Sequence, residues 1–255
     1  MAPAFAKRMS LLGTETAFAV GAEAAELSSK GVKVYPFHLG DLDFQTPEHI
    51  RKAACRALEE GKTGYCPNAG IRPLREALAR DVGCARGLSL NVENISVQPG
   101  GKPVIGKFVM AFMDPGDEVL YPNPGFPIYE SMIRFHGGVA KPYEFLETES
   151  GFALDFESIK RQITPATKLL IYNNYHNPTS AASDETEMEN LAKFCVEHDL
   201  AVLSDEAYFD ILYDGKGKSI ASFPGMFERT LILYTFSKKF AMTGWRLGAA
   251  IGPKN

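Results

Sequence analysis

The chain has 255 residues, of which 45% are hydrophobic and 23% are charged, as in an ordinary globular protein with one large core or two smaller ones. Its formal net charge of −4 leaves no basic excess, so we expect no nucleic-acid partner. The apolar runs are far shorter than the ~20 residues of a membrane span, and the N-terminus lacks a secretion signal, so we expect a cytoplasmic protein without a membrane partner.

The first third of the chain is expected to be mainly helical. The patterns predict a helix over 8–30, a strand over 32–39, and further helices over 47–60 and 71–82. Gly31 stands in the usual stop position of the first helix. Thr46 is expected to cap the second helix, with Pro47 at its first position.

From residue 95 onward, apolar strands alternate with helical patterns. The expected strands are 95–98, 118–121, 140–146, 167–172, 200–204, 230–234 and 247–251. The expected helices are 104–113, a helix that follows the turn at 123–127 and ends at 134, 155–162 and 184–198. This alternation predicts an α/β fold, in which a mostly parallel sheet carries helices on both faces.

Two candidates for binding a charged ligand follow predicted strands. Gly100, Gly101 and Lys102 connect a strand to a helix, where their amides could bind an anion or form a plain tight turn. Asp205 directly follows the strand 200–204 and could hold a protonated ring nitrogen or cap a helix. Because parallel strands end at one edge of a sheet, these candidates should lie together.

Other residues near strand ends have plain structural interpretations as well. Asn177 could simply form a turn, Tyr208 could be a packed aromatic, and Phe126 could belong to the core. His38 and His176 flank these loops, and we interpret both as structural histidines.

The strand 230–234 leads into a stretch with a chemical character of its own. It contains Thr235, Ser237, Lys238 and Lys239, with Arg246 close behind. A primary amine beside hydroxyls and a fixed cation suits an aldehyde that carries a phosphate. An amine of this kind must lose its proton before it can attack a carbonyl.

The four cysteines are scattered along the chain. Cys55, Cys66, Cys84 and Cys195 have no paired spacing, which argues against a zinc site or a disulfide framework. We therefore expect no metal and a reducing compartment.

The stretch 237–248 closely resembles the pyridoxal-phosphate attachment region of class I/II aminotransferases, the fold-type I enzymes related to aspartate aminotransferase. Further similar motifs occur in the family order at 39–44, 64–75, 100–102, 114–117, 176–179 and 205–208. The resemblance implies a three-layer αβα large domain over 47–255, preceded by an N-terminal arm and small-domain segment over 1–46.

The resemblance also implies pyridoxal 5′-phosphate as cofactor, with Lys238, Asp205 and Tyr208 as catalytic residues. Lys238 would form the Schiff base, since the spacing to Arg246 favours it over Lys239, and Asp205 would pair with the pyridinium nitrogen. The implied phosphate contacts are Thr235, Ser237, Arg246 and the amides of Gly101 and Lys102. The implied ring contacts are Asn177 and Tyr208 at the phenolic oxygen and Phe126 on the ring face.

The implied reaction moves an amino group between an L-amino acid and a 2-oxo acid. Gly40 and Asn177 would lie near the substrate, and Tyr65 would reach the phosphate in the neighbouring subunit's site of a homodimer. A β-elimination lyase that uses the same cofactor is the alternative within enzymes.

The chain departs from the family pattern at two positions and at its end. Ser180 stands where glycine is usual, and Leu42 stands where proline is common. The family's domain continues well beyond Asn255. The resemblance therefore implies a C-terminally truncated chain that lacks most of the small domain and the arginine for the substrate carboxylate. A chain that binds the cofactor without turnover is the third interpretation.

Overall fold

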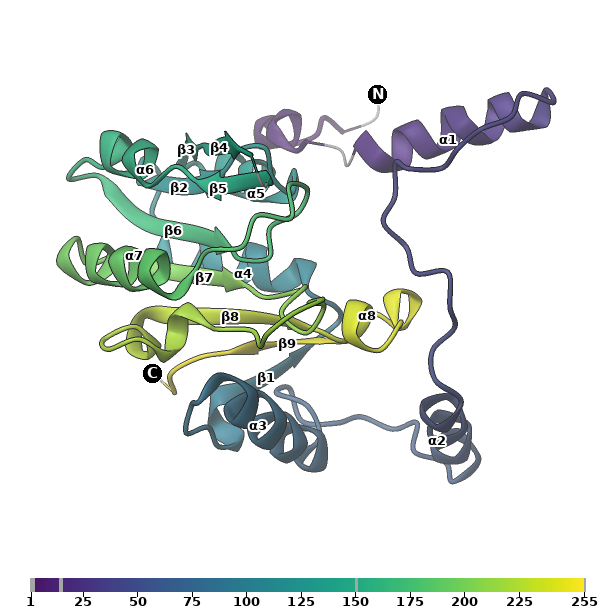
Figure 1. The fold of residues 1–255 in the computed structure, drawn as a ribbon. Helices are drawn as coiled ribbons and strands as arrows, with labels where there is room; N and C mark the ends of the chain where they lie inside the picture. The colour runs from purple at the N-terminus through teal and green to yellow at the C-terminus, as the bar shows by residue number, and fades with distance from the viewer. Residues whose placement is uncertain (1–2, 14–15, 150, 255) are drawn as a thin grey trace.

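The computed structural model describes residues 3–13, 16–149 and 151–254. A seven-stranded sheet in the order β1-β9-β8-β7-β6-β2-β3 forms its centre (Figure 1). The strands are β1 (Ile95–Gln98), β2 (Glu118–Pro122), β3 (Val139–Tyr143), β6 (Thr167–Asn173), β7 (Ala201–Asp205), β8 (Thr230–Thr235) and β9 (Gly248–Ile251). β9 is antiparallel to both of its neighbours, whereas the other neighbouring strands pair in parallel, which confirms the mostly parallel sheet.

Helices cover both faces of this sheet (Figure 1). The helices α4 (Lys102–Phe112) and α5 (Ile128–Phe135) lie on one face, and α3 (Arg72–Arg86), α6 (Phe156–Gln162) and α7 (Glu185–Glu197) lie on the other. Successive residues of β6 alternate between the two cores: Leu169 and Ile171 pack on the α4 side, Leu170 and Tyr172 on the α7 side. The αβα layering expected from the sequence is confirmed.

Further elements complete the described chain. They are η1 (Lys7–Leu11), α1 (Thr16–Ser29), α2 (Glu48–Glu59), η2 (Val92–Asn94), β4 (Phe145–Thr148), β5 (Gly151–Leu154), η3 (Ile220–Ser222), η4 (Phe227–Arg229), α8 (Phe236–Lys239) and η5 (Thr243–Trp245). None of the described helices is long and apolar enough to cross a membrane.

Three expectations for the elements were wrong. The expected strand 140–146 divides into β3 and β4, because the backbone of Glu144 pairs with Ser158 and Asp155 instead of extending the sheet. The single helix expected over 8–30 is η1 followed by α1; positions 14 and 15 lie outside the described residues.

The third wrong expectation is the strand over 32–39, which pairs with no strand in the described part of the chain. Phe37 is 93% exposed there, so its apolar side chain has no core to join. The expected cap also differs, because Pro47 occupies the N-cap position of α2. The Thr46 hydroxyl instead donates to the carbonyl of Ala241, 2.5 Å away.

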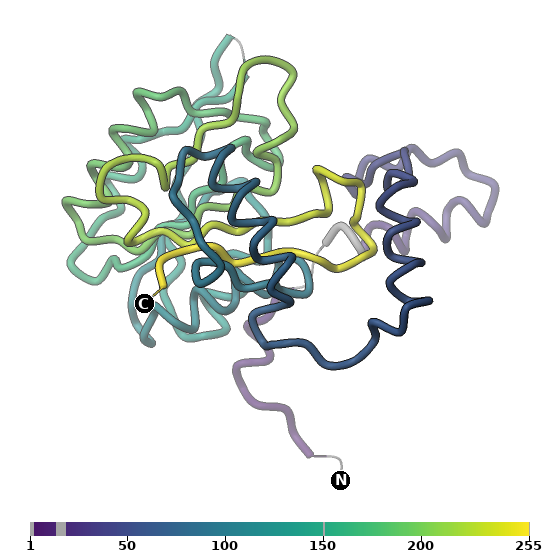
Figure 2. Tube along the Cα trace, turned by 90° about the horizontal axis from the view of Figure 1, so that it is seen from below, coloured from purple at the N-terminus to yellow at the C-terminus, as the bar shows by residue number. Residues whose placement is uncertain are grey.

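The segment before α3 stands off the sheet. Figures 1 and 2 show α1 and α2 away from the body of the molecule, joined by an extended segment that passes the edge where β7 and β8 end. No residue of α2 is buried. Besides the Thr46–Ala241 bond, the segment is tied to the region after β8 by hydrogen bonds from Lys238 Nζ to the Gly40 carbonyl (2.7 Å), from Thr243 Oγ1 to Asp41 (3.0 Å) and from Trp245 Nε1 to Thr46 (3.1 Å).

Candidate active site at the carboxyl edge of the sheet

The sheet topology gathers the candidate residues at one edge. β8, β7, β6 and β2 are parallel and end there, and β1 runs in the same direction because it and β8 both pair antiparallel with β9. β9 begins at this edge, where Gly248 lies opposite both Gln98 and Thr235. Arg246, just before β9, therefore meets the loop that follows β1.

Lys238 points from α8 toward the extended N-terminal segment. Its Nζ donates to the carbonyl of Gly40 at 2.7 Å and lies 5.7 Å from the centre of the Tyr208 ring. Desolvation lowers the pKa of Lys238, although the Asp41 carboxylate opposes the shift. A depressed pKa raises the share of neutral amine, which is the form that attacks a carbonyl.

Lys239 is engaged elsewhere. Its Nζ lies 3.0 Å from Asp81 and 3.4 Å from Asp210. Each lysine lies over an aromatic ring, Tyr208 for Lys238 and Phe240 for Lys239. Their polar partners differ: a backbone carbonyl for Lys238, and two carboxylates for Lys239.

Two hydroxyl residues precede Lys238 in the chain, and the guanidinium of Arg246 lies against the loop after β1. Thr235 caps α8, its Oγ1 accepting from the Ser237 amide at 3.2 Å and lying 3.0 Å from Ser237 Oγ. Gly100 has φ of +92°, and a Cβ there would lie 2.3 Å from Nη2 of Arg246. Glycine therefore allows the guanidinium to lie directly against the backbone that leads into α4.

Gly101 and Lys102 occupy the start of α4. Gly101 is the N-cap residue, and Lys102 is the first residue of the helix. Amides in the first turn of a helix have no intrahelical acceptor, and the helix dipole favours an anion at this end.

Asp205 is a buried carboxylate at the end of β7. It accepts from the hydroxyl of Tyr129 at 2.7 Å and from the amide of Ala207 at 3.1 Å. Desolvation raises the pKa of Asp205, and the nearby Glu206 adds to the shift, against the opposing effect of the two hydrogen bonds. A protonated ring nitrogen would supply the positive charge that this carboxylate lacks.

The remaining ring candidates lie around Asp205. Phe126 is half-buried, with its ring edge-on to Tyr129 at 5.8 Å between centroids. Tyr208 is also half-buried, and desolvation and then Asp205 raise its pKa. The backbone N–H of Asn177 donates to Asn173 Oδ1 at 3.0 Å.

Sequence reasoning missed Tyr129 and Asn173. Asn173 Nδ2 donates to the backbone carbonyl of Asp205 at 3.0 Å, so it links the ends of β6 and β7. Asn173 directly follows the predicted strand 167–172, just as Asp205 directly follows the strand 200–204. The same criterion would therefore have identified Asn173. Tyr129 carries no comparable signal, because its contact depends on how α5 packs on the sheet.

Tyr65 and Gly40 relate differently to this cluster. Tyr65, in the loop between α2 and α3, is fully exposed and stands apart from it, whereas Gly40 contacts Lys238 through its backbone carbonyl. His176 is buried, stacks on Phe145 at 4.1 Å between centroids, and has Nδ1 2.8 Å from Thr179, consistent with a structural histidine. Desolvation lowers its pKa to about 4.

Comparison with known proteins gives a consistent family. The family model described as aminotransferase class I and II matches residues 32–255. Aspartate/prephenate aminotransferase of Thermus thermophilus is 44% identical over 250 residues, covering 97% of this chain and 64% of that protein. Aromatic-amino-acid aminotransferase 2 of Thermococcus litoralis is 42% identical over 219 residues, covering 85% of this chain and 56% of that protein.

The solved structures agree with the sequences. The structure of Thermus thermophilus aspartate aminotransferase with maleate matches at a TM-score of 0.93 and 42% identity, covering 99% of this chain and 65% of that one. The chain therefore spans 56% to 65% of the length of these relatives. It belongs to the class I and II aminotransferase family.

Proposed function

We propose that the protein is a pyridoxal-phosphate-dependent aminotransferase, which moves an amino group between an L-amino acid and a 2-oxo acid. The proposal rests on three groups that lie at one edge of the sheet. They are the partly desolvated amine of Lys238, the buried carboxylate of Asp205, and the guanidinium of Arg246, which lies against the backbone of Gly100. Aspartate is the first donor to test, because the names of several relatives include it.

The phosphate-binding part combines four kinds of donor. Arg246 supplies a fixed positive charge, Thr235 and Ser237 supply hydroxyls, and the start of α4 at Gly101 and Lys102 supplies backbone amides. Charge-assisted hydrogen bonds from such donors are about twice as strong as neutral ones. This set fits a phosphate monoester dianion.

A second group of residues would bind the pyridine ring of the cofactor. Asp205 would hold the ring nitrogen protonated, and the Tyr129 hydroxyl donates to Asp205. Asn177 and Tyr208 would bind the phenolic oxygen, and Phe126 would pack on the ring. When bound, the cofactor supplies an electron sink that stabilises negative charge at the substrate Cα.

Lys238 is the group that would move the proton. Its Nζ would take the proton from the substrate Cα and hold it for return, because a flexible amine can reach both sides of the transfer. The Gly40 carbonyl accepts from that amine at 2.7 Å and would help to orient it. We propose that Gly40 also lies near the substrate carboxylate.

We further propose a homodimer in the cytoplasm. Tyr65 points into solvent from its own subunit, which suits a residue that reaches a partner's phosphate site. The boundary at 46/47 separates the arm and small-domain segment, residues 1–46, from the cofactor domain. The four cysteines are free thiols, as a reducing compartment requires.

A single-turnover assay tests the proposed reaction. The purified chain is loaded with pyridoxal phosphate and mixed with L-aspartate, and oxaloacetate and pyridoxamine phosphate are quantified. We expect one of each per loaded site. Release of ammonia with the cofactor unchanged would favour the lyase alternative, and binding without either product would favour a chain that only binds the cofactor.

A further inference from the structure

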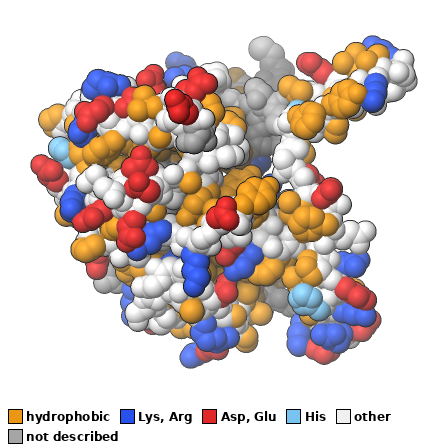
Figure 3. All heavy atoms as spheres, in the orientation of Figure 1, with side chains coloured by type: hydrophobic (Ala, Val, Ile, Leu, Met, Phe, Trp, Pro, Cys, Tyr) orange, Lys and Arg blue, Asp and Glu red, His pale blue; other side chains and the backbone are white. Residues whose placement is uncertain are grey.

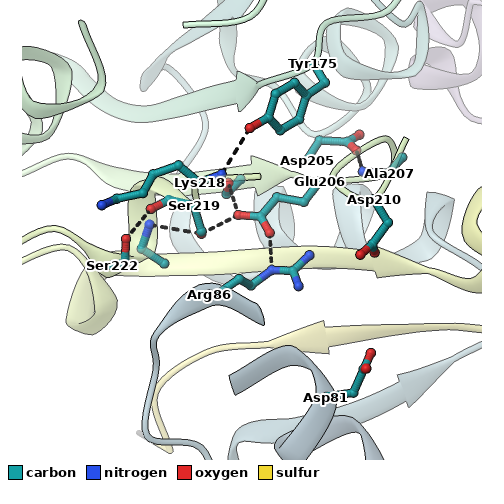
Figure 4. Close-up of polar contacts among 12 residues, drawn as sticks. Asp81, Arg86, Tyr175, Asp205, Glu206, Ala207, Asp210, Lys218, Ser219 and Ser222 are labelled. Atoms are coloured by element: carbon teal, nitrogen blue, oxygen red, sulfur yellow. Dashed lines mark hydrogen bonds and ion pairs between the residues drawn. The ribbon is translucent and has the colours of Figure 1, made fainter. Parts of the chain in front are cut away.

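The residue that directly follows Asp205 takes part in a buried ion pair (Figure 4). Arg86, the last residue of α3, donates from Nε to Glu206, and their side chains are 1% and 3% exposed. Glu206 directly follows Asp205 and also accepts from the hydroxyls of Ser204, at 2.9 Å, and Ser219. Its carboxylate is therefore held from α3, from β7 and from the segment that leads into η3.

The guanidinium of Arg86 also stacks on aromatic rings. Its carbon lies 3.7 Å from the centre of the Phe209 ring and 5.8 Å from that of Tyr234. Its Nη2 is buried without a hydrogen-bond partner. Arg86 thus contacts the segment after β7 twice, once at Glu206 and once at Phe209.

The contacts of residues 205–209 alternate between two surroundings. Asp205 bonds to Tyr129 of α5, and the Tyr208 ring lies 5.7 Å from Lys238 Nζ. Glu206 and Phe209 contact Arg86 instead. The two residues that we assign to the cofactor ring therefore share one short segment with the two residues that Arg86 holds.

A buried ion pair often adds little to the free energy of folding. The cost of desolvating two charges often exceeds their attraction, so apolar residues of similar volume can be as stable or more so. Removing one partner, in contrast, leaves an uncompensated charge. Here that charge would be Glu206, which stands next to Asp205 in the chain.

We propose that Arg86 and Glu206 form a positioning pair, which fixes the segment 205–209 so that Asp205 meets the ring nitrogen of the cofactor and Tyr208 meets its phenolic oxygen. The pair touches neither substrate nor cofactor and acts through the backbone that it anchors. This inference rests on the proposed function, since it concerns the same ring site.

The test compares two ligands that differ at a single atom. Pyridoxal phosphate and its analogue with carbon in place of the ring nitrogen make the same phosphate contacts, so the ratio of their affinities reports the contact to Asp205. The ratio is measured by absorbance titration for the wild-type chain and for Arg86→Met, which keeps the length and apolar packing of the side chain.

We expect Arg86→Met to reduce this preference about fivefold. Arg229→Met is the matched control, since Arg229 bonds Asp199 at 2.9 Å and the Leu200 carbonyl at 3.3 Å, near the start of β7 and away from the site. It should leave the preference unchanged. If Arg86→Met does not fold, the double variant Arg86→Met with Glu206→Gln removes both charges and should show the same reduced preference.

An unchanged preference in a folded Arg86 variant, or an equal loss in Arg229→Met, would overturn the positioning role. A wild-type chain that binds both ligands equally well would instead refute the assignment of Asp205 to the ring nitrogen. The two failures are therefore distinguishable.

Discussion

Asp205 illustrates a conflict between stability and function in one residue. Its carboxylate is buried, and its side-chain hydrogen bonds come from the hydroxyl of Tyr129 and the amide of Ala207. Desolvation raises its pKa, with a further contribution from Glu206. Between the ordinary carboxyl pKa and the raised folded value, the folded protein without cofactor therefore binds more protons at this residue than the unfolded chain does.

This conflict predicts that Asp205→Asn stabilises the chain without cofactor. Between the ordinary carboxyl pKa of 3.8 and the raised folded value, the folded state binds more protons than the unfolded state, so wild-type stability falls as pH rises. Asparagine can accept from the Ala207 amide with its oxygen and donate from its NH2 to the Tyr129 hydroxyl, and it carries no charge, so it escapes this loss. Urea unfolding should show an advantage for Asp205→Asn that grows with pH and reaches about 1 kcal/mol near neutrality. A difference independent of pH would contradict the explanation.

Gly100 offers a second test at the residue scale. Alanine there requires φ near +92° and also displaces Nη2 of Arg246, which lies 2.3 Å from the new Cβ position. Gly116, with φ of +97° and no neighbour within 4 Å, provides a matched control for backbone strain alone. Both substitutions should cost about 1–3 kcal/mol of stability. Only Gly100→Ala should also weaken pyridoxal phosphate binding, by about tenfold, in an absorbance titration. If both variants bound pyridoxal phosphate with the same affinity, the close contact between Gly100 and Arg246 would not matter for binding the cofactor.

At the scale of elements, the sequence predicted what local patterns determine. The strand β8 and the helix α7 were expected within a residue or two, because apolar runs and capping residues are local signals. The strand over 32–39 was wrong, because an apolar pattern does not reveal whether a partner strand is present. Thr46 was wrong for a related reason: its hydroxyl finds an acceptor at Ala241, 195 residues away.

The candidate site also contains residues that local sequence patterns identify and residues whose contacts depend on the packing of distant segments. Lys238 and Asp205 were accessible to sequence reasoning, since parallel strands end at one edge and both residues follow strands. Tyr129 and Arg86 were not, because each lies on a helix and contacts a residue at the end of β7 or directly after it. Their contacts depend on how α5 and α3 pack on the sheet.

Thr46 allows a test of how the N-terminal segment is held. Thr46→Val removes the hydrogen bonds to the Ala241 carbonyl and from Trp245 Nε1, each worth about 0.5–1.5 kcal/mol. Trp245 is the only tryptophan, so its fluorescence reports on this contact. Acrylamide should quench the Thr46→Val variant more strongly than the wild type. Thr63→Val, at an exposed position between α2 and α3, should behave like the wild type. Equal quenching in all three proteins would show that these bonds do not hold the segment.

The whole molecule consists of a packed αβα body and an extended N-terminal part. Hydrophobic side chains are exposed along that part in Figure 3. They include Phe5, Val20, Leu27, Tyr35 and Phe37. Side chains of this kind gain stability when another surface covers them. This exposure agrees with the proposed association of two copies.

The proposed dimer predicts a coupling between association and cofactor affinity. Sedimentation should show a concentration-dependent dimer, and Tyr65→Phe should weaken pyridoxal phosphate binding about fivefold in the dimer, because a phosphate contact is lost. In dilute monomer the substitution should have no effect, since Tyr65 is fully exposed in its own subunit. The same loss of affinity in monomer and dimer would contradict a shared site.

The central claim is that Lys238 is the amine that carries the cofactor, and reductive trapping tests it most directly. The chain is incubated with pyridoxal phosphate, treated with borohydride and digested, and fragment masses assign the label to Lys238 or Lys239. Lys238→Arg and Lys239→Arg are matched variants, and the second keeps a cation beside Asp81 and Asp210. The account predicts a label on Lys238 that Lys238→Arg abolishes and Lys239→Arg retains. A label on Lys239, or a label that survives in Lys238→Arg, would contradict it.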